Sequence, residues 1–106
     1  EQLWAAGEWA SPFGLDPDAD DTGYGHDPED VARVRPASVE ALLAYADAAQ
    51  ARAVAYLGTL TGDDRDRVVD ERWDPPVTLG VRLVSIADDA IQHAGQAAYV
   101  RGLLGA

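Results

Sequence analysis

The sequence contains no cysteine, no methionine and no lysine in its 106 residues. Without cysteine the chain has no disulfide framework, no thiolate nucleophile and no cysteine-based zinc site, and a reducing cytoplasm is the predicted location. A complete translation product normally begins with methionine, whereas this chain opens at Glu1. We therefore expect the sequence to begin partway through a longer protein, or to have been processed.

Basic residues are also scarce. The chain has eight arginines and nineteen acidic residues, which gives a net charge of −11. Nucleic-acid binding depends on clustered Lys and Arg, so this balance argues against a nucleic-acid partner. No apolar run approaches the ~20 residues of a membrane span, and no basic-then-apolar signal segment opens the chain. We predict a small-molecule substrate and neither a nucleic-acid nor a membrane partner.

Hydrophobic residues make up 47% of the chain, enough for the packed core of one domain. Apolar spacing and breaker residues divide it into a helix end and aromatic loop (1–15), an acidic loop and short helix (16–37), a long helix (38–61), a connection with one helical turn (62–77) and a final long helix (78–104). Asp27, Ser38 and Thr78 are the predicted N-caps of the three helices, and Gly62 is well placed beyond the end of the long helix. The predicted fold is all-α, of the up-down four-helix-bundle type.

Two long helices cannot fully bury two apolar faces against each other and a short third element, whereas four helices can. Residues 1–106 are therefore interpreted as a single partial bundle domain that lacks its N-terminal helices. We expect the missing cover to come from an upstream segment or from a second copy in a homodimer.

The first third of the chain carries two features with alternative interpretations. Trp4, Trp9 and Phe13 form an aromatic cluster, interpreted mainly as an anchor of the loop to the bundle and alternatively as the wall of a ligand pocket. His26 lies in the acidic loop; a loop histidine is usually solvated, and the alternative is that it approaches a pocket as a ligand or supporting residue. The acidic loop lacks the glycine and the final glutamate of a calcium loop, so we predict no calcium site there.

The final helix carries the main candidate site. Its apolar positions recur in steps of three and four from Leu79 to Leu104, the pattern of a helix packed along its length. His93 interrupts this seam, with Asp89 one turn before it and Gln96 nearly one turn after it. An inward-facing polar layer costs free energy unless it is fully paired or binds something.

Side chains four apart on a helix have Cβ atoms about 5–6 Å apart, so Asp89 and His93 can address one ion. Carboxylate oxygen and imidazole nitrogen are both zinc ligands, but two ligands are too few and a third must come from elsewhere. Spacing alone leaves open both a metal site and a hydrogen-bonded pair.

The segment from Asp89 to Ala97 (DAIQHAGQA), followed by Tyr99-Val100-Arg101-Gly102-Leu103, resembles the last helix of the DinB-like superfamily. That superfamily includes mycothiol-dependent maleylpyruvate isomerases and related thiol S-transferases. The resemblance implies a four-helix bundle and a divalent metal, zinc or nickel, held by one histidine of an early helix and two side chains four apart on the last helix.

By this resemblance His93 corresponds to the final ligand, Asp89 to the ligand before it, and Gln96 and Arg101 to the residues that follow. Asp89 is shorter than the usual glutamate, so an alternative is that it orients His93 from outside the coordination sphere. No counterpart of the early-helix histidine is present, because His26 lies in a loop. Arg101 could meet an anionic group or simply favour the helix C-terminus.

The resemblance implies a metal-dependent, thiol-transferase-like protein that uses a low-molecular-weight thiol such as mycothiol. The absence of cysteine agrees with a thiol that comes from a cofactor. The alternative is a non-catalytic helical binding or interaction protein, in which Asp89, His93 and Gln96 form a closed hydrogen-bonded layer. Whether the protein is an enzyme is left open by the sequence.

Overall fold

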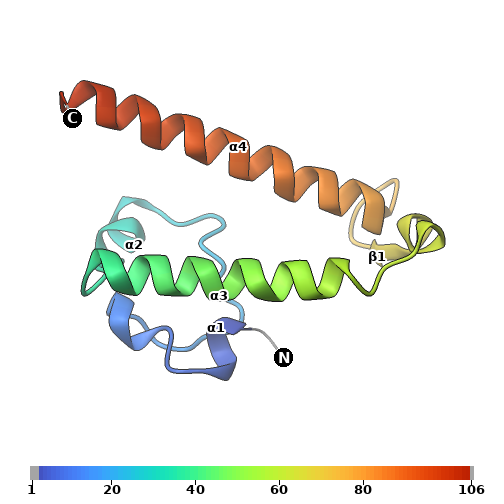
Figure 1. Ribbon diagram of the computed structural model, residues 1–106, viewed down its shortest axis with the longest axis horizontal. Coiled ribbons are helices and arrows are strands. Elements are labelled where there is room, and N and C mark those ends of the chain that lie inside the picture. The colour runs from blue at the N-terminus through green and yellow to red at the C-terminus, as the bar shows by residue number, and fades with distance from the viewer. Residues whose placement is uncertain (1–2, 106) are drawn as a thin grey trace. The chain divides into compact units, whose positions relative to one another are not determined.

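The computed structural model describes residues 3–105, and the chain forms two compact units, Glu1–Thr59 and Leu60–Ala106. The described residues are mostly helical, with α1 at Leu3–Ala6, α2 at Pro28–Arg33, α3 at Val39–Leu57 and α4 at Leu79–Leu103 (Figure 1). Two long helices and several short helical segments confirm the predicted all-α class. Within the described range, no helix combines the length and apolarity that a membrane crossing requires.

Helices α2 and α3 of the first unit begin at their predicted capping residues. The Asp27 side chain accepts hydrogen bonds from the backbone N–H groups of Glu29 and Asp30, and the Asp30 side chain accepts one from the backbone of Asp27. This reciprocal capping box satisfies N–H groups that lack partners inside the helix. The Ser38 hydroxyl caps α3 by accepting from the N–H of Ala41 at 3.1 Å.

The prediction of a helix reaching residue 61 was wrong, because α3 ends at Leu57. Gly58 follows, and the hydroxyl and N–H of Thr59 both donate to the carbonyl of Tyr56, at 2.7 and 2.9 Å. These bonds satisfy a terminal carbonyl locally, so the chain leaves the helix one turn before Gly62.

The core of the first unit is an aromatic cluster built around Tyr45 of α3. Tyr45 contacts Trp4, Trp9 and Phe13 with ring centroids 5.4, 5.5 and 5.7 Å apart. Phe13, at the end of the short 3₁₀ helix η1 (Ser11–Phe13), is 5% exposed. The cluster therefore anchors the N-terminal loop to α3, as the main interpretation of the sequence proposed.

Backbone hydrogen bonds complete this attachment. The N–H of Arg35 donates to the carbonyl of Phe13 at 3.0 Å, and that of Ala37 donates to Pro12 at 2.7 Å. Gly14 closes η1 with a φ of +73°, a left-handed conformation that favours glycine. These bonds thus tie η1 to the segment that precedes α3.

The second unit begins with a 3₁₀ helix, η2 (Gly62–Asp66), and continues into two short antiparallel strands, β1 (Val68–Asp70) and β2 (Val77–Thr78). Val68 pairs with Thr78, and Asp70 pairs with Val77. The helical turn in the connection was predicted, but the strands were not. Strands of three and two residues show no periodicity, and their pairing joins segments on either side of Pro75 and Pro76.

The hairpin and η2 hold the first turns of α4. The Thr78 hydroxyl caps the helix by accepting from Val81, and the N–H of Leu79 donates to the carbonyl of Arg67 at 2.8 Å. Leu79 is 4% exposed. A Cβ at Gly80 would lie 3.3 Å from the carbonyl oxygen of Arg65, so this close approach of α4 to η2 favours glycine.

A buried carboxylate joins the hairpin to α4. Asp70 is 9% exposed; its Oδ1 accepts from the backbone N–H and Nε of Arg72, and its Oδ2 accepts from Nη2 of Arg72 and of Arg82, both at 2.9 Å. Hydrogen bonds from the Arg72 side chain, then from its backbone, hold the pKa of Asp70 far below its ordinary value of 3.8.

We predict that this carboxylate makes the second unit acid-sensitive. Because its pKa is lowered by folding, ionised Asp70 stabilises the folded state above pH 3.8, and that contribution is lost as the pH falls below this value. Asp70→Asn should lower the Tm at pH 7 by roughly 4–8 °C, and the difference from wild type should shrink below pH 4. Thermal unfolding from pH 7 to pH 2 measures this. Asp63→Asn, at an exposed position of η2, is the matched control. If the difference in Tm between wild type and Asp70→Asn did not change with pH, the prediction would be contradicted.

Candidate functional site

Three side chains predicted to act together do meet on the middle turns of α4. Nδ1 of His93 lies 2.9 Å from Oε1 of Gln96, and Nε2 of His93 lies 3.6 Å from Oδ2 of Asp89. The helix places Asp89 and Gln96 on either side of the ring, four residues before it and three after it. One ring nitrogen is therefore hydrogen-bonded, and the other faces a carboxylate.

The expected burial of this polar layer is not observed. The side chains of His93 and Asp89 are 69% and 74% exposed among the described residues. Within the second unit, η2 and the hairpin contact α4 near its first turns, where Leu79 is buried, and the middle turns lie beyond these elements. The contacts among the three side chains come from helix geometry and do not need burial.

The contact with Gln96 bears on which nitrogen of His93 a metal ion could use. If Nδ1 donates its proton to Oε1 of Gln96, Nε2 of the neutral ring keeps its lone pair. Histidines that bind metals commonly donate their other N–H to an oxygen in this way, which orients the ring. The arrangement leaves Nε2 of His93 and a carboxylate oxygen of Asp89 as neighbouring donors.

The separation of these donors suits a single ion. Two ligands at about 2.0–2.2 Å from a tetrahedral zinc ion lie roughly 3.3–3.6 Å apart, and the observed distance between Nε2 and Oδ2 is 3.6 Å. Residues 3–105 contain no group of three or more His, Asp or Glu side chains able to hold a metal ion. The donor set thus fits two ligands of a divalent site, and the described residues do not supply a third.

The other predicted site residues lie apart from this trio along the chain. Arg101 lies in the last turn of α4, where its side chain is exposed and a cation is favoured by the helix dipole. His26 belongs to the first unit, in the loop before α2.

His26 has a partner that sequence reasoning did not identify. Its Nε2 lies 2.7 Å from Oδ1 of Asp21, and the two side chains are 21% and 26% exposed. The hydrogen bond from His26, followed by one from the backbone N–H of Gly23, lowers the pKa of Asp21 from 3.8. The sequence signal for this contact was the pair of glycines between the two residues, Gly23 and Gly25. Both adopt a positive φ, which lets the loop turn back so that Asp21 and His26 meet.

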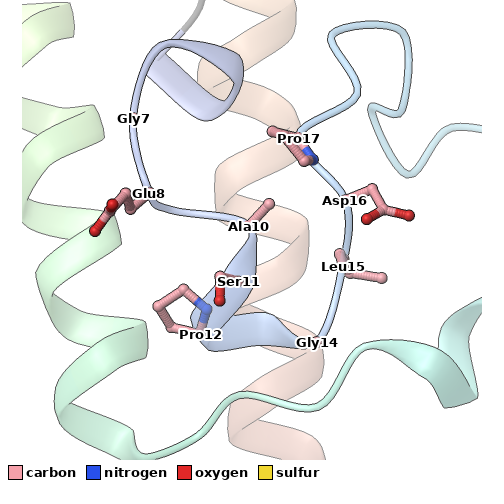
Figure 2. A pocket seen from close by; sticks show the side chains of 9 residues that line it. All are labelled: Gly7, Glu8, Ala10, Ser11, Pro12, Gly14, Leu15, Asp16 and Pro17. Carbon is pink, nitrogen blue, oxygen red and sulfur yellow. The ribbon is translucent and has the colours of Figure 1, made fainter.

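Asp21 and His26 line a hollow of about 410 Å³, together with Trp4, Leu15 and Tyr45. A larger hollow of about 720 Å³ lies among the loops around η1 (Figure 2). Its acidic side chains, Glu8 and Asp16, point away from its centre in opposite directions. The larger hollow therefore brings no polar groups together, whereas the smaller one does.

Comparison with known proteins identifies the chain's relatives. The mycothiol S-transferase family matches residues 1–106, the whole chain. The chain is also similar to a conserved protein of Enterococcus faecalis with a crystal structure, at 39% identity and a TM-score of 0.84. That similarity covers 95% of this chain and 59% of the other protein, so the chain spans well under two thirds of that relative's length. No curated protein matches the chain.

Proposed function

We propose, because the chain belongs to the mycothiol S-transferase family, that its α4 supplies two ligands of a divalent-metal site in a protein that transfers mycothiol or a similar thiol. His93 would bind the ion, zinc or nickel, through Nε2, and Asp89 through a carboxylate oxygen. Such an ion supplies Lewis acidity that lowers the pKa of a coordinated thiol. The chain has no cysteine, so the thiol comes from the cofactor.

The hydrogen bond between His93 and Gln96 is the observation that best supports this proposal. When Nδ1 donates to Gln96, Nε2 of the neutral ring keeps its lone pair, and this atom lies 3.6 Å from Oδ2 of Asp89. Gln96 is thus a positioning residue in the proposed site. Arg101, eight residues after His93 on α4, is proposed to attract an anionic group of the thiol or substrate.

The partners proposed for this protein follow from its exposed apolar surface. In α3, Leu42, Leu43 and Val54 are 48%, 58% and 61% exposed, and in α4 Val84 and Ile86 are 70% and 59% exposed. Exposed apolar rows of this extent favour association. We propose that these apolar rows are covered by further helices of the protein or by a second copy in a homodimer. We also propose that the protein acts in the cytoplasm and that its substrate is a small molecule.

A non-catalytic function is the second candidate. It is favoured by the same three side chains, because the contacts of His93 with Asp89 and Gln96 pair their polar groups with one another. In that case the trio would fix the register of α4 against partner helices. The protein would then bind ligands or proteins without turnover.

Metal removal separates the two candidates. The full-length protein is assayed for mycothiol-dependent conversion of 1-chloro-2,4-dinitrobenzene to its thioether, before and after dialysis against a chelator. The leading proposal predicts loss of at least about nine tenths of the enzymatic rate after dialysis, with recovery on adding stoichiometric Zn²⁺ or Ni²⁺. An unchanged rate in metal-free protein rules out the metal-dependent mechanism, and no rate at all in metal-loaded protein supports the non-catalytic alternative.

A further inference from the structure

The first unit contains a partly enclosed hollow that the proposed metal site does not use. Its volume is about 410 Å³. Trp4, Leu15, Val34 and Tyr45 give it an apolar lining, while Asp21 and His26 place polar groups at its edge. Small-molecule sites combine these elements, an apolar lining that holds the body of the ligand and a few polar groups that orient it.

Hydrogen bonds fix the positions of the two polar side chains at the edge of the hollow, Asp21 and His26. Oδ1 of Asp21 accepts from Nε2 of His26 at 2.7 Å and from the N–H of Gly23 at 3.3 Å. With the Nε2 proton directed at Asp21, the neutral ring presents Nδ1 as an acceptor. No other described residue makes a hydrogen bond to the His26 side chain, and Nδ1 is therefore available to a ligand.

A second polar group of the lining lacks a partner. The indole N–H of Trp4 is buried and makes no hydrogen bond with any described residue. Buried donors normally find an acceptor, because leaving one unpaired costs free energy. Trp4 is thus a residue of the lining with an unsatisfied donor, and the acceptor that the neutral His26 ring offers at the edge is Nδ1.

The loop that lines the hollow is mainly acidic. Asp21 belongs to the lining, Asp16, Asp18, Asp20 and Asp27 are close to it in the sequence, and Arg33 is a cation whose charge acts on Asp21. An anionic ligand would lose free energy by approaching these carboxylates. A neutral hydroxyl avoids this repulsion.

We propose that this hollow binds a neutral small molecule with an apolar, ring-sized body and a hydroxyl group that donates to Nδ1 of His26. The site belongs to the first unit alone, and binding there requires no metal. It adds a recognition site for a phenol-like or alicyclic alcohol to the proposed function of α4 and stands independently of that function.

The test uses phenol as the probe and the two histidines of the chain as reporters. Proton NMR follows their C2–H signals in the metal-free 106-residue chain during a phenol titration, with His93→Ala used to assign them. Phenol should shift the His26 signal saturably and leave the His93 signal in place. Anisole, which has the same ring but no hydroxyl, should bind roughly five- to tenfold more weakly, as should phenol to Asp21→Asn. Benzoate should bind more weakly than phenol.

Two further variants distinguish weaker phenol binding from a folding defect. His26→Phe keeps a ring in the lining but removes the acceptor, and Tyr24→Phe removes an exposed hydroxyl from the same loop as a control. Circular dichroism verifies the helical content of both, and tryptophan fluorescence measures their affinity for phenol. The proposal expects weaker binding in His26→Phe and unchanged binding in Tyr24→Phe. Equal affinities for phenol and anisole, equal shifts of both histidines, or no saturable shift would overturn it.

Discussion

His93→Ala is expected to lower the affinity of the full-length protein for Zn²⁺ by about 10²–10³-fold. Structural zinc binding contributes roughly 10–16 kcal/mol over four ligands, so one ligand accounts for about 2.5–4 kcal/mol. In the proposed site the ligand atom that this substitution removes is Nε2 of His93, which lies 3.6 Å from Oδ2 of Asp89. Competition with a chromophoric chelator at pH 7, together with elemental analysis of the purified protein, measures the change.

The chain offers a matched control for this substitution. His26→Ala also replaces a histidine that is hydrogen-bonded to a neighbouring oxygen, but in the first unit. It should leave the zinc affinity within about twofold of wild type. Equal metal affinities in wild type and His93→Ala would remove α4 from the metal site and leave the non-catalytic function as the better account.

Phe13→Ala is expected to destabilise the first unit by about 3–5 kcal/mol. Phe13 is 5% exposed, and its ring meets those of Trp4 and Tyr45 with centroids 5.7 Å apart in both cases. The substitution removes this packing from the aromatic cluster around Tyr45, in which Phe13 is the most deeply buried ring. Urea unfolding followed by tryptophan fluorescence gives the free energy of unfolding.

Tyr24→Ala is the control for Phe13→Ala, because it deletes an aromatic ring that is 93% exposed. Its free energy of unfolding should stay within about 0.5 kcal/mol of wild type. If the two variants unfold at the same urea concentration, the aromatic cluster is not the core of this unit.

Local signals predicted most of the helical structure. Asp27, Ser38 and Thr78 each cap a helix with a side-chain oxygen, as their positions in the sequence indicated. These predictions succeed because a cap depends on residues two or three positions away. The end of α3 was missed because Thr59 satisfies the carbonyl of Tyr56 before Gly62 is reached.

Features that depend on distant residues were not predictable in the same way. The β1–β2 hairpin pairs segments on either side of two prolines, and the Asp70 carboxylate accepts a hydrogen bond from Arg82, twelve residues away. The contact of Asp21 with His26 needed two glycines with positive φ in a loop without periodicity. In contrast, the contacts of His93 with Asp89 and Gln96 follow from helix spacing alone, so the sequence predicted them. The sequence analysis expected these side chains to be buried, whereas His93 and Asp89 are exposed.

The tautomer of His93 in the metal-loaded, full-length protein tests the account most directly. Long-range proton–nitrogen NMR of the ring distinguishes a protonated Nδ1 from a protonated Nε2, and loading with ¹¹³Cd shows which nitrogen is coupled to the metal. We expect a protonated Nδ1, directed at Gln96, and a metal-coupled Nε2. A ring protonated at Nε2, with no coupling to cadmium, would contradict the assignment of α4 as a ligand-bearing helix.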